Sequence, residues 1–216
     1  MKRKLIWFFL LLCFFVLSGL AIFANRQKNE LTRSETDYLQ NHFMSQYHRL
    51  DLRSLWLTKI PNICQDYTGS VLADIRSIDL WDNKISSVDV DLSCLVHLQE
   101  LDLSYNDIDS VEKLGNLSNL ISLQIQNNQI KKISGLKHLD KLLSLNLSYN
   151  QIESLDGLKN LFQLQELQLQ HNRISDVSTI KGLKNLEILK IESNNVSFTD
   201  IEYLKNMSSI QELNTD

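Results

Sequence analysis

Hydrophobic residues recur on a fixed grid along most of this chain. In residues 142–164, LLSLNLSYNQIESLDGLKNLFQL, apolar and polar residues alternate around Leu145 and Leu147, and an asparagine follows three residues later. The same grid begins 22 residues earlier at Leu120 and 22 residues later at Leu164. The alternation predicts a short strand whose side chains point to two opposite faces. Self-similarity at a period of about 20–29 residues predicts an array of stacked coils.

Six complete units and one partial unit fill residues 75–216. The complete units begin at Ile75, Leu98, Leu120, Leu142, Leu164 and Leu186, and the partial unit begins at Ile210. The steps are 23, 22, 22, 22, 22 and 24 residues, so the insertions fall at the two ends of the array. After the strand, about a dozen residues remain for the return. We therefore expect 3₁₀ or irregular segments there rather than long helices.

The grid resembles the leucine-rich repeat L-x-x-L-x-L-x-x-N-x-I-x-x-L-x-x-L-x-x-L of the 22-residue class, found in internalins and in a phosphatase-regulating subunit. Eight positions match in three consecutive units. The resemblance covers residues 52–216. It implies an α/β solenoid, a horseshoe whose parallel sheet lines a concave surface and whose convex side is short 3₁₀ or irregular structure. Unlike internalins, the sequence shows no wall-anchoring motif and no separate domain after the repeats, which argues against an adhesin or invasin role.

The ninth position of every complete unit is asparagine. These residues are Asn83, Asn106, Asn128, Asn150, Asn172 and Asn194. They are flanked by inward apolar residues, where an unpaired amide costs about 1–3 kcal/mol. The resemblance implies a ladder in which each side chain bonds the backbone of adjacent coils. We interpret these asparagines as structural, not as ligand-binding groups.

An apolar stretch occupies the N-terminus. Residues 5–24 carry no charge and follow Lys2, Arg3 and Lys4. Twenty residues at about 1.5 Å each span about 30 Å, the thickness of a bilayer core. Residues 1–24 are therefore predicted to be a signal anchor or a cleaved signal peptide. Three basic residues lie on each side of the stretch, so their charge does not decide its orientation. The very short N-terminal tail with its amino group favours a single-pass topology with the repeats outside the cytoplasm, or secretion, including to a periplasm, after cleavage.

The polar residues 25–33 are predicted to form a juxtamembrane linker, and residues 34–74 an N-terminal cap that includes a degenerate repeat. A helix face is predicted from Leu39, Phe43, Tyr47 and Leu50, which recur at helical spacing. The degenerate unit begins at Leu52, with Leu55 and Leu57 on the grid and Ile60 in place of the asparagine. A cap of this kind would cover the open end of the core, as terminal repeats must.

Outside the apolar stretch the chain has two cysteines, Cys64 and Cys94. In an oxidising compartment they would join the cap to the first complete repeat. Two separate buried thiols are an equally good interpretation, because free cysteine is often buried.

Composition and motifs argue against several classes of function. The net charge is -4, which disfavours a nucleic-acid-binding face. The sequence contains no phosphate-binding loop, G-x-S-x-G, H-E-x-x-H or C-x-x-C motif, and no histidine pair at metal-ligand spacing. We therefore predict no catalytic residue, no cofactor, no metal and no small-molecule substrate. The chain is not expected to be an enzyme.

Function in a repeat array of this kind is expected on the outward side of the strands. Counting from the first residue of each unit, the fifth, seventh and eighth positions do not belong to the apolar grid, so the grid does not restrict their residue type. The candidate residues are Trp56, Asp79, Trp81, Asp102, Tyr105, Gln124, Gln126, Tyr149, Gln168 and His171. Trp81, Tyr105, Tyr149 and His171 form a candidate line of aromatic anchors. The leading prediction is recognition of an unidentified protein partner. The alternatives are a carbohydrate-binding face and a structural envelope spacer.

Overall fold

The computed structural model describes residues 43–44, 48–66 and 75–215. The strands are β1 Phe43–Met44, β2 Arg49–Asp51, β3 Ser77–Asp79, β4 Glu100–Asp102, β5 Ser122–Gln124, β6 Ser144–Asn146, β7 Glu166–Gln168, β8 Ile188–Lys190 and β9 Glu212–Asn214. The α-helices are α3 Ile63–Asp66 and α5 Phe198–Lys205, and the 3₁₀ helices are η2 Glu112–Asn116, η3 Ser134–His138, η4 Asp156–Leu158 and η5 Ile180–Gly182. The predicted apolar segment 1–24 and the linker 25–33 lie outside these residues. None of the helices described is long and apolar enough to cross a membrane.

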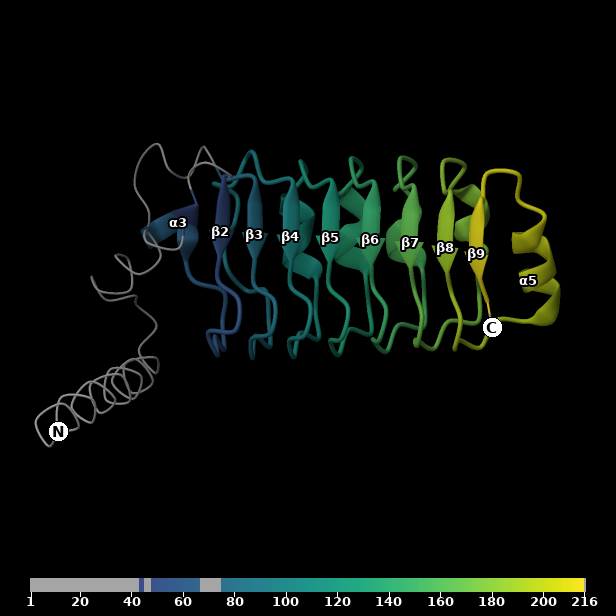
Figure 1. Cartoon of the computed structure of the whole chain (residues 1–216), viewed down its shortest axis with the longest axis horizontal. Coiled ribbons are helices and arrows are strands. Elements are labelled where there is room, and N and C mark those ends of the chain that lie inside the picture. Colours follow the sequence, from purple (N-terminus) through teal and green to yellow (C-terminus); the bar gives the residue numbers. More distant parts are fainter. Residues whose placement is uncertain (1–42, 45–47, 67–74, 216) are drawn as a thin grey trace, which may run out of the picture. The chain divides into compact units, whose positions relative to one another are not determined.

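The strands stack in chain order into one sheet, in which β2 to β9 run parallel (Figure 1). Each strand pairs with the equivalent residues of the next coil. Leu101 lies opposite Leu123, and Leu123 lies opposite Leu145, a step of 22 residues each time. The insertions lengthen this step only at the ends, to 23 residues from Ile78 to Leu101 and to 24 from Leu189 to Leu213. The register predicted from the leucine spacing for the complete repeats is therefore the register of the sheet.

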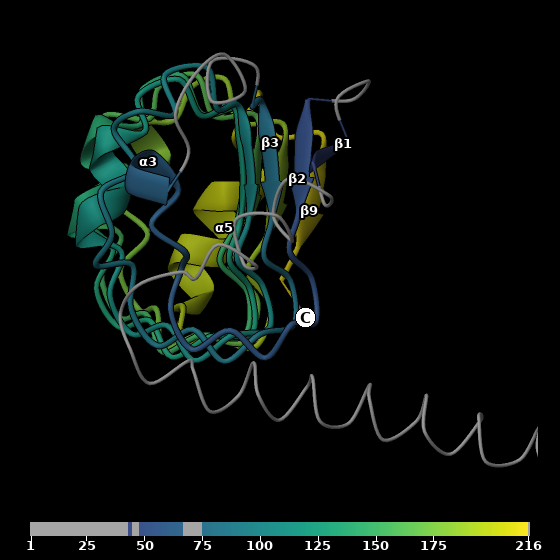
Figure 2. The same ribbon diagram turned by 90° about the vertical axis from the view of Figure 1, so that its left-hand side faces the viewer.

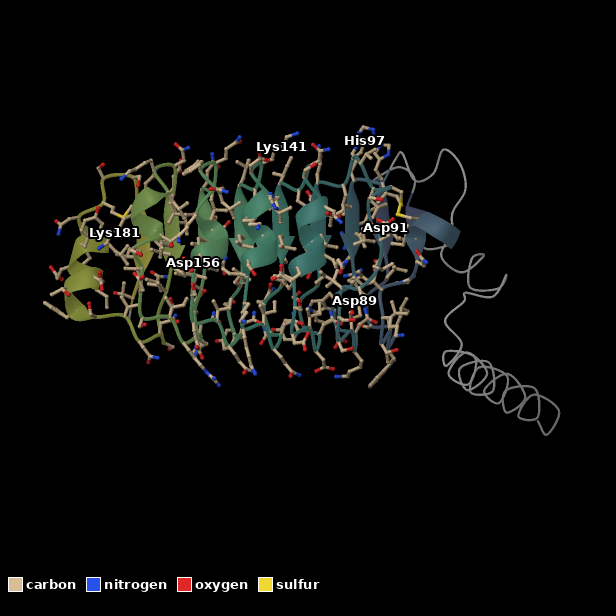
Figure 3. All side chains as sticks on the ribbon, turned by 180° about the vertical axis from the view of Figure 1, so that it is seen from behind. Asp89, Asp91, His97, Lys141, Asp156 and Lys181 are labelled. Carbon is tan, nitrogen blue, oxygen red and sulfur yellow. A yellow bond between two sulfur atoms is a disulfide. The ribbon has the colours of Figure 1, made fainter. Side chains whose placement is uncertain are left out.

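The core lies between the sheet and the returning segments. Viewed along the stack, the strands form one side and the short helices the other (Figure 2). Leu145 on β6, Leu147 just after it and Leu158 on η4 are all fully buried. Figure 3 shows the helical side, with Asp156 and Lys181 labelled. As expected, the return segments of the central repeats are 3₁₀ helices.

The asparagines join neighbouring coils through both the nitrogen and the oxygen of their side-chain amides. Asn150 Nδ2 donates to the carbonyls of Ile125 at 3.1 Å and Leu147 at 3.1 Å, and its Oδ1 accepts from the Ile130 N–H at 3.0 Å. The same set of bonds recurs at Asn106, Asn128 and Asn172 and in the terminal coils. The ladder occupies backbone groups at the end of each strand that have no sheet partner, which would be costly to leave unpaired.

The last complete repeat departs from the others in its return segment. Two extra residues there allow an eight-residue α-helix, α5, in place of a 3₁₀ turn. Ser197 caps this helix, because its side chain accepts a hydrogen bond from the Asp200 N–H at 3.2 Å. Lys181 of η5 lies 3.4 Å from the Asp200 carboxylate and 4.4 Å from the centre of the Tyr203 ring. Helix α5 is thereby attached to the preceding coil.

The cap differs from the prediction in two ways. Phe43–Met44 and Arg49–Asp51 are antiparallel strands, so the predicted helix face containing Phe43 and Leu50 is wrong. Leu39 and Tyr47 lie outside the described residues. The hydrophobic spacing was ambiguous because Leu50 is buried equally well as the inward residue of a strand.

The degenerate repeat also has a different register. Leu50 pairs with Ile78, so Leu50 and not Leu55 takes the fourth position, and the fifth position belongs to Asp51. The step from this coil to the next is 28 residues, which places Leu55 where the asparagine would stand. The backbone N–H of Leu55 instead donates to Asn83 of the next repeat at 3.1 Å. Pairing with β3 decides this register, and the leucine spacing alone does not reveal it.

Cys64 and Cys94 form a disulfide that closes 30 residues of chain. Cys64 lies in α3, and Cys94 lies in the return segment of the first complete repeat. The bridge therefore joins the cap to the repeat array, which was one of the two interpretations of the cysteine pair.

Candidate functional site

The outward side of the sheet carries the candidate residues. Fourth- and sixth-position side chains such as Leu123 and Ile125 point inward and are fully buried. Third, fifth, seventh and eighth positions therefore form what we call the sheet face. The third positions, which were not among the residues predicted from the sequence, are Ser77, Glu100, Ser122, Ser144, Glu166 and Ile188. The period-two alternation of a strand could have identified them.

The eighth position has an unusual backbone in every complete repeat. Its residues have φ between 54° and 57°: Asp82, Tyr105, Asn127, Tyr149, His171 and Ser193. This left-handed region is uncommon for residues other than glycine, and asparagine, aspartate and histidine tolerate it best. Backbone hydrogen bonds between neighbouring coils continue through this turn. The Tyr105 N–H donates to the Gln126 carbonyl at 3.0 Å, and the Tyr149 N–H donates to the Gln170 carbonyl at 2.8 Å. The eighth-position side chains are therefore aligned on a rigid backbone.

The aromatic anchors form two pairs rather than one line. The Trp81 and Tyr105 rings meet edge to face with their centroids 5.8 Å apart. The Tyr149 and His171 rings are stacked at 4.2 Å. Asn127 takes the eighth position of the coil between these pairs. The two tyrosines remain 50% and 51% exposed, and Trp81 is 37% exposed, so three large rings stand on the surface without being part of the core.

Between these pairs the sheet face is polar and almost uncharged. Asn146 is buried and accepts hydrogen bonds from the Ser148 N–H at 3.1 Å and from its hydroxyl at 2.7 Å. Gln124 is half-buried, and Gln168 donates to Glu166 at 2.7 Å. Asn146 and Gln168, two of the predicted fifth-position residues, are thus hydrogen-bonded to side chains of their own coils.

Two glutamines of the sheet face keep an acceptor without a partner. Gln126 Oε1 and Gln170 Oε1 are buried and accept no hydrogen bond from the residues that the structure describes. Both occupy the seventh position, two repeats apart. Such acceptors are costly to leave unpaired, so they are groups that a bound partner could satisfy after a small side-chain rotation.

The N-terminal end of the sheet face holds an ion-pair cluster. Asp79 is buried and pairs with Arg49, and Arg53 lies 3.3 Å from the same carboxylate and 2.7 Å from Asp51. Burial raises the pKa of Asp79, and the nearby arginines oppose this effect only in part. The hydrogen bond from Arg53 lowers the pKa of Asp51. Neither arginine was predicted from the sequence, because the register expected for the degenerate repeat was wrong.

Other predicted residues lie apart from this arrangement. Asp102 is half-buried on β4 and accepts hydrogen bonds from the N–H of Ser104 at 2.9 Å and from its hydroxyl. Trp56 is 67% exposed, but the pairing of β2 places it after the strand and not at the fifth position, which corrects its assignment to the sheet face. No group of three metal-ligating side chains occurs in the described parts of the chain.

Comparison with known proteins identifies the repeat type. A family model described as leucine-rich repeats (2 copies) matches residues 118–160 and 163–206, and a leucine-rich repeat model matches residues 95–111. No curated protein sequence matches the chain. Similar solved structures include an internalin (inlF) from Listeria monocytogenes, with 28% identity and a TM-score of 0.60. That match covers 66% of this chain and 42% of the internalin.

Two further solved structures are similar to this chain. An internalin C2 (inlC2) from Listeria monocytogenes has 26% identity and a TM-score of 0.60, with 92% of both chains covered. The TLR13–ssRNA13 complex has 26% identity and a TM-score of 0.58. The match covers 69% of this chain and 22% of TLR13. The chain thus spans less than half of inlF and TLR13 but nearly the whole of inlC2.

Proposed function

Because the chain is a leucine-rich repeat protein, we propose that it is a non-catalytic module that recognises a protein partner through its sheet face. It acts outside the cytoplasm, either held in a membrane by residues 1–24 or secreted after their removal. The partner meets Trp81, Tyr105 and Tyr149.

The observation that carries the proposal is the exposure of these rings on a rigid backbone. Aromatic side chains dominate the binding energy of many protein interfaces, because they bury a large area while few torsions become fixed. The asparagine ladder and the parallel pairing hold the Tyr105 and Tyr149 backbones in the left-handed region before any partner arrives. A face that is ordered in advance avoids part of the entropic cost of association.

The groups on the sheet face suit binding better than acid–base catalysis. Its central residues are amides and hydroxyls, which do not titrate near neutral pH. Asp79 is engaged by Arg49 and Arg53, and Asp102 by Ser104. A carboxylate held in this way is not placed to exchange a proton with a substrate.

A nucleic-acid partner is disfavoured, although one of the similar structures is a complex of TLR13 with ssRNA13. The net charge of this chain is -4, and Asp82, Glu100 and Asp102 lie on or beside the sheet face. Phosphate backbones bind to clusters of lysine and arginine. On this face Arg49 and Arg53 are already engaged with aspartates.

The proposed location is supported by two features. The stretch 5–24 is long enough to enter a bilayer or to direct export. The Cys64–Cys94 disulfide belongs to an oxidising compartment, since cytosolic thiols are kept reduced.

The test is capture of a partner by crosslinking in the native host. The full chain is compared with a triple variant, Trp81→Ser, Tyr105→Asn and Tyr149→Asn, which takes its replacements from the same positions of other repeats. A control variant, Phe162→Ser and Phe198→Ser, removes exposed rings that lie in return segments. We expect a protein that the wild type and the control capture and the triple variant loses. Equal capture by all three chains contradicts the proposal and favours a binding surface elsewhere, and no capture by any favours a structural spacer.

A further inference from the structure

In four consecutive coils the fifth, seventh and eighth positions of the sheet face have a period of two repeats that the core does not have. Residues 101–106 read LDLSYN and residues 145–150 read LNLSYN, whereas the intervening coils read LQIQNN at 123–128 and LQLQHN at 167–172. Inward positions are the same type in all four coils. Outward positions alternate between a serine–tyrosine pair and a glutamine-rich set. Core packing requires nothing of this kind, so the alternation belongs to whatever the face contacts.

The pairing of the strands gives the distance that corresponds to two repeats. Tyr105 follows β4 and Tyr149 follows β6, with β5 between them in unbroken register. Parallel strands lie about 4.8 Å apart, so the two tyrosine backbones are about 9.6 Å apart across the strands. The unpartnered acceptors at the seventh position, Gln126 Oε1, Gln170 Oε1 and Glu192 Oε2, do not follow this period, because the last two lie in adjacent repeats. A ligand that uses both tyrosines in the same way must repeat itself at about this distance.

Among regular peptide conformations, polyproline II has the matching repeat. It advances about 3.1 Å per residue with three residues per turn, so the same side recurs about every 9.3 Å. An α-helix presents the same side about every 5.4 Å, and an extended strand about every 6.8 Å. Prolyl rings also pack well on tyrosine and tryptophan, and the conformation is formed before binding, so little chain entropy is lost.

We propose that the sheet face binds a proline-rich segment of the partner in the polyproline II conformation, lying across strands β3 to β7. This inference rests on the proposed function and specifies its ligand. One prolyl ring packs on Tyr105, beside Trp81, and the ring one turn later packs on Tyr149, beside His171. Asn127, which is shorter, leaves room for the residues between them.

Charge indicates what flanks the prolines. Asp82 is next to Tyr105 in the row of eighth positions, and Glu100 and Asp102 lie on β4. The Asp82 carboxylate accepts only a hydroxyl hydrogen bond, from Ser54 at 2.9 Å, among its described contacts. By contrast, β5 and β6 carry no charged residue. The segment therefore carries an arginine or lysine just beyond the proline on Tyr105 and is uncharged over β5 and β6.

The test titrates full-length protein, in detergent micelles, with a fluorescently labelled synthetic peptide of about twelve residues, which spans about 37 Å in this conformation. The peptide has proline at every third position and arginine at one end. A scrambled peptide of the same composition is the first control. We expect saturable binding of the periodic peptide, and binding of the scrambled peptide that is at least about tenfold weaker, a difference of about 1.4 kcal/mol.

A register-shift variant makes the test specific to the spacing. In Asn127→Tyr combined with Tyr149→Asn, the composition is unchanged, but the two tyrosines lie on adjacent coils. Both positions have the same left-handed backbone, with φ of 56° and 55°, so either residue fits either place. We expect this variant to lose peptide affinity at least about tenfold, as much as Tyr105→Asn combined with Tyr149→Asn. Circular dichroism checks that each variant is folded, and Phe162→Ser is the matched control that retains binding.

The outcomes separate the two proposals. Equal binding of periodic and scrambled peptides, or full affinity in the register-shift variant, overturns the polyproline II inference. If the peptide does not bind while crosslinking still captures a protein through the same tyrosines, the inference fails and the proposed function stands. Binding of an oligosaccharide of β-1,4-linked N-acetylglucosamine in place of the peptide, used as a third ligand, overturns both.

Discussion

A Cβ atom added to Gly157 would lie 1.9 Å from the carbonyl oxygen of Ile133, in the preceding coil. The contact sits where 3₁₀ helices η3 and η4 stack on the side opposite the sheet. Gly135 occupies the equivalent place one coil earlier, and a Cβ added there would lie 2.3 Å from the carbonyl oxygen of Val111. Gly115 lies two positions further along its own coil, where an added Cβ would lie 2.7 Å from the carbonyl oxygen of Gly135. Glycine at this position therefore allows successive return segments to pack closely.

The first prediction concerns this contact. Replacing Gly157 with alanine should destabilise the protein by about 1–3 kcal/mol, because the coil must shift away from a backbone atom that cannot rotate aside. Gly182→Ala is the matched control, since nothing lies within 4 Å of its added Cβ. Its effect should stay within about 0.5 kcal/mol. Urea unfolding measures both, and equal midpoints for the two variants would contradict the packing argument.

The second prediction concerns the asparagine ladder. Asn150→Ala leaves the Ile130 N–H and the carbonyls of Ile125 and Leu147 without the partner they have now. We expect a loss of at least about 2 kcal/mol in the free energy of unfolding, because buried backbone groups are left unsatisfied. Asn160→Ala removes an exposed amide with one bond of 3.5 Å and should change stability little. A small effect in both variants would show that water replaces the ladder.

The third prediction concerns the disulfide. Cys64→Ser should lower the free energy of unfolding by about 3–4 kcal/mol, because a bridge that closes 30 residues restricts the unfolded chain. The protein has three cysteines if residues 1–24 are retained and two if they are removed, because Cys13 lies in that segment. A denatured, unreduced sample should therefore titrate one thiol in the first case and none in the second, and reduction should release two more in either case. If two or more thiols react without reductant in protein purified from its native compartment, the cysteines are not bridged there.

The fourth prediction concerns pH. Burial raises the pKa of Asp79 in the folded state above the value of about 3.9 in an unfolded chain. Between these two values the folded state binds more protons, so the contribution of Asp79 to stability is largest at low pH and declines as pH rises through the raised pKa. The difference in free energy of unfolding between wild type and Asp79→Asn should therefore decrease from about pH 3 to neutral.

A second aspartate provides the opposite case for this measurement. A backbone hydrogen bond from Ser93 lowers the pKa of Asp91. Its contribution is present above the unfolded value and is lost as pH falls, so the difference between wild type and Asp91→Asn should increase with pH. Urea unfolding at several pH values measures both differences. Parallel trends in the two variants would be inconsistent with this account.

The complete repeats could be predicted because every coil has the same apolar pattern and pairs with its neighbours in the same register. Leu123, Leu145 and Leu167 lie opposite one another at the spacing at which they recur in the sequence. The short return predicted the 3₁₀ helices, and the resemblance to leucine-rich repeats implied the asparagine ladder. The exposed rings could also be predicted, because the seventh and eighth positions that carry them do not belong to the apolar grid.

The ends of the array and the grouping of the site could not be predicted in the same way. In the degenerate repeat the apolar residues fit more than one register, and only pairing with β3 assigns Asp51, Arg49 and Arg53 to the sheet face. Likewise, one row of aromatic residues separates into two pairs because the contact of two rings depends on side-chain directions in neighbouring coils.

The sequence by itself determined the repeat length, the inward residues and the direction of stacking, since these follow from a local period that each coil satisfies with its immediate neighbours. Only the tertiary structure decided the pairing of Cys64 with Cys94, the engagement of Asp79 by two arginines and the grouping of the aromatic rings into two pairs. These depend on groups from different coils, and the position of one coil relative to another is fixed by packing and hydrogen bonds that no local period contains.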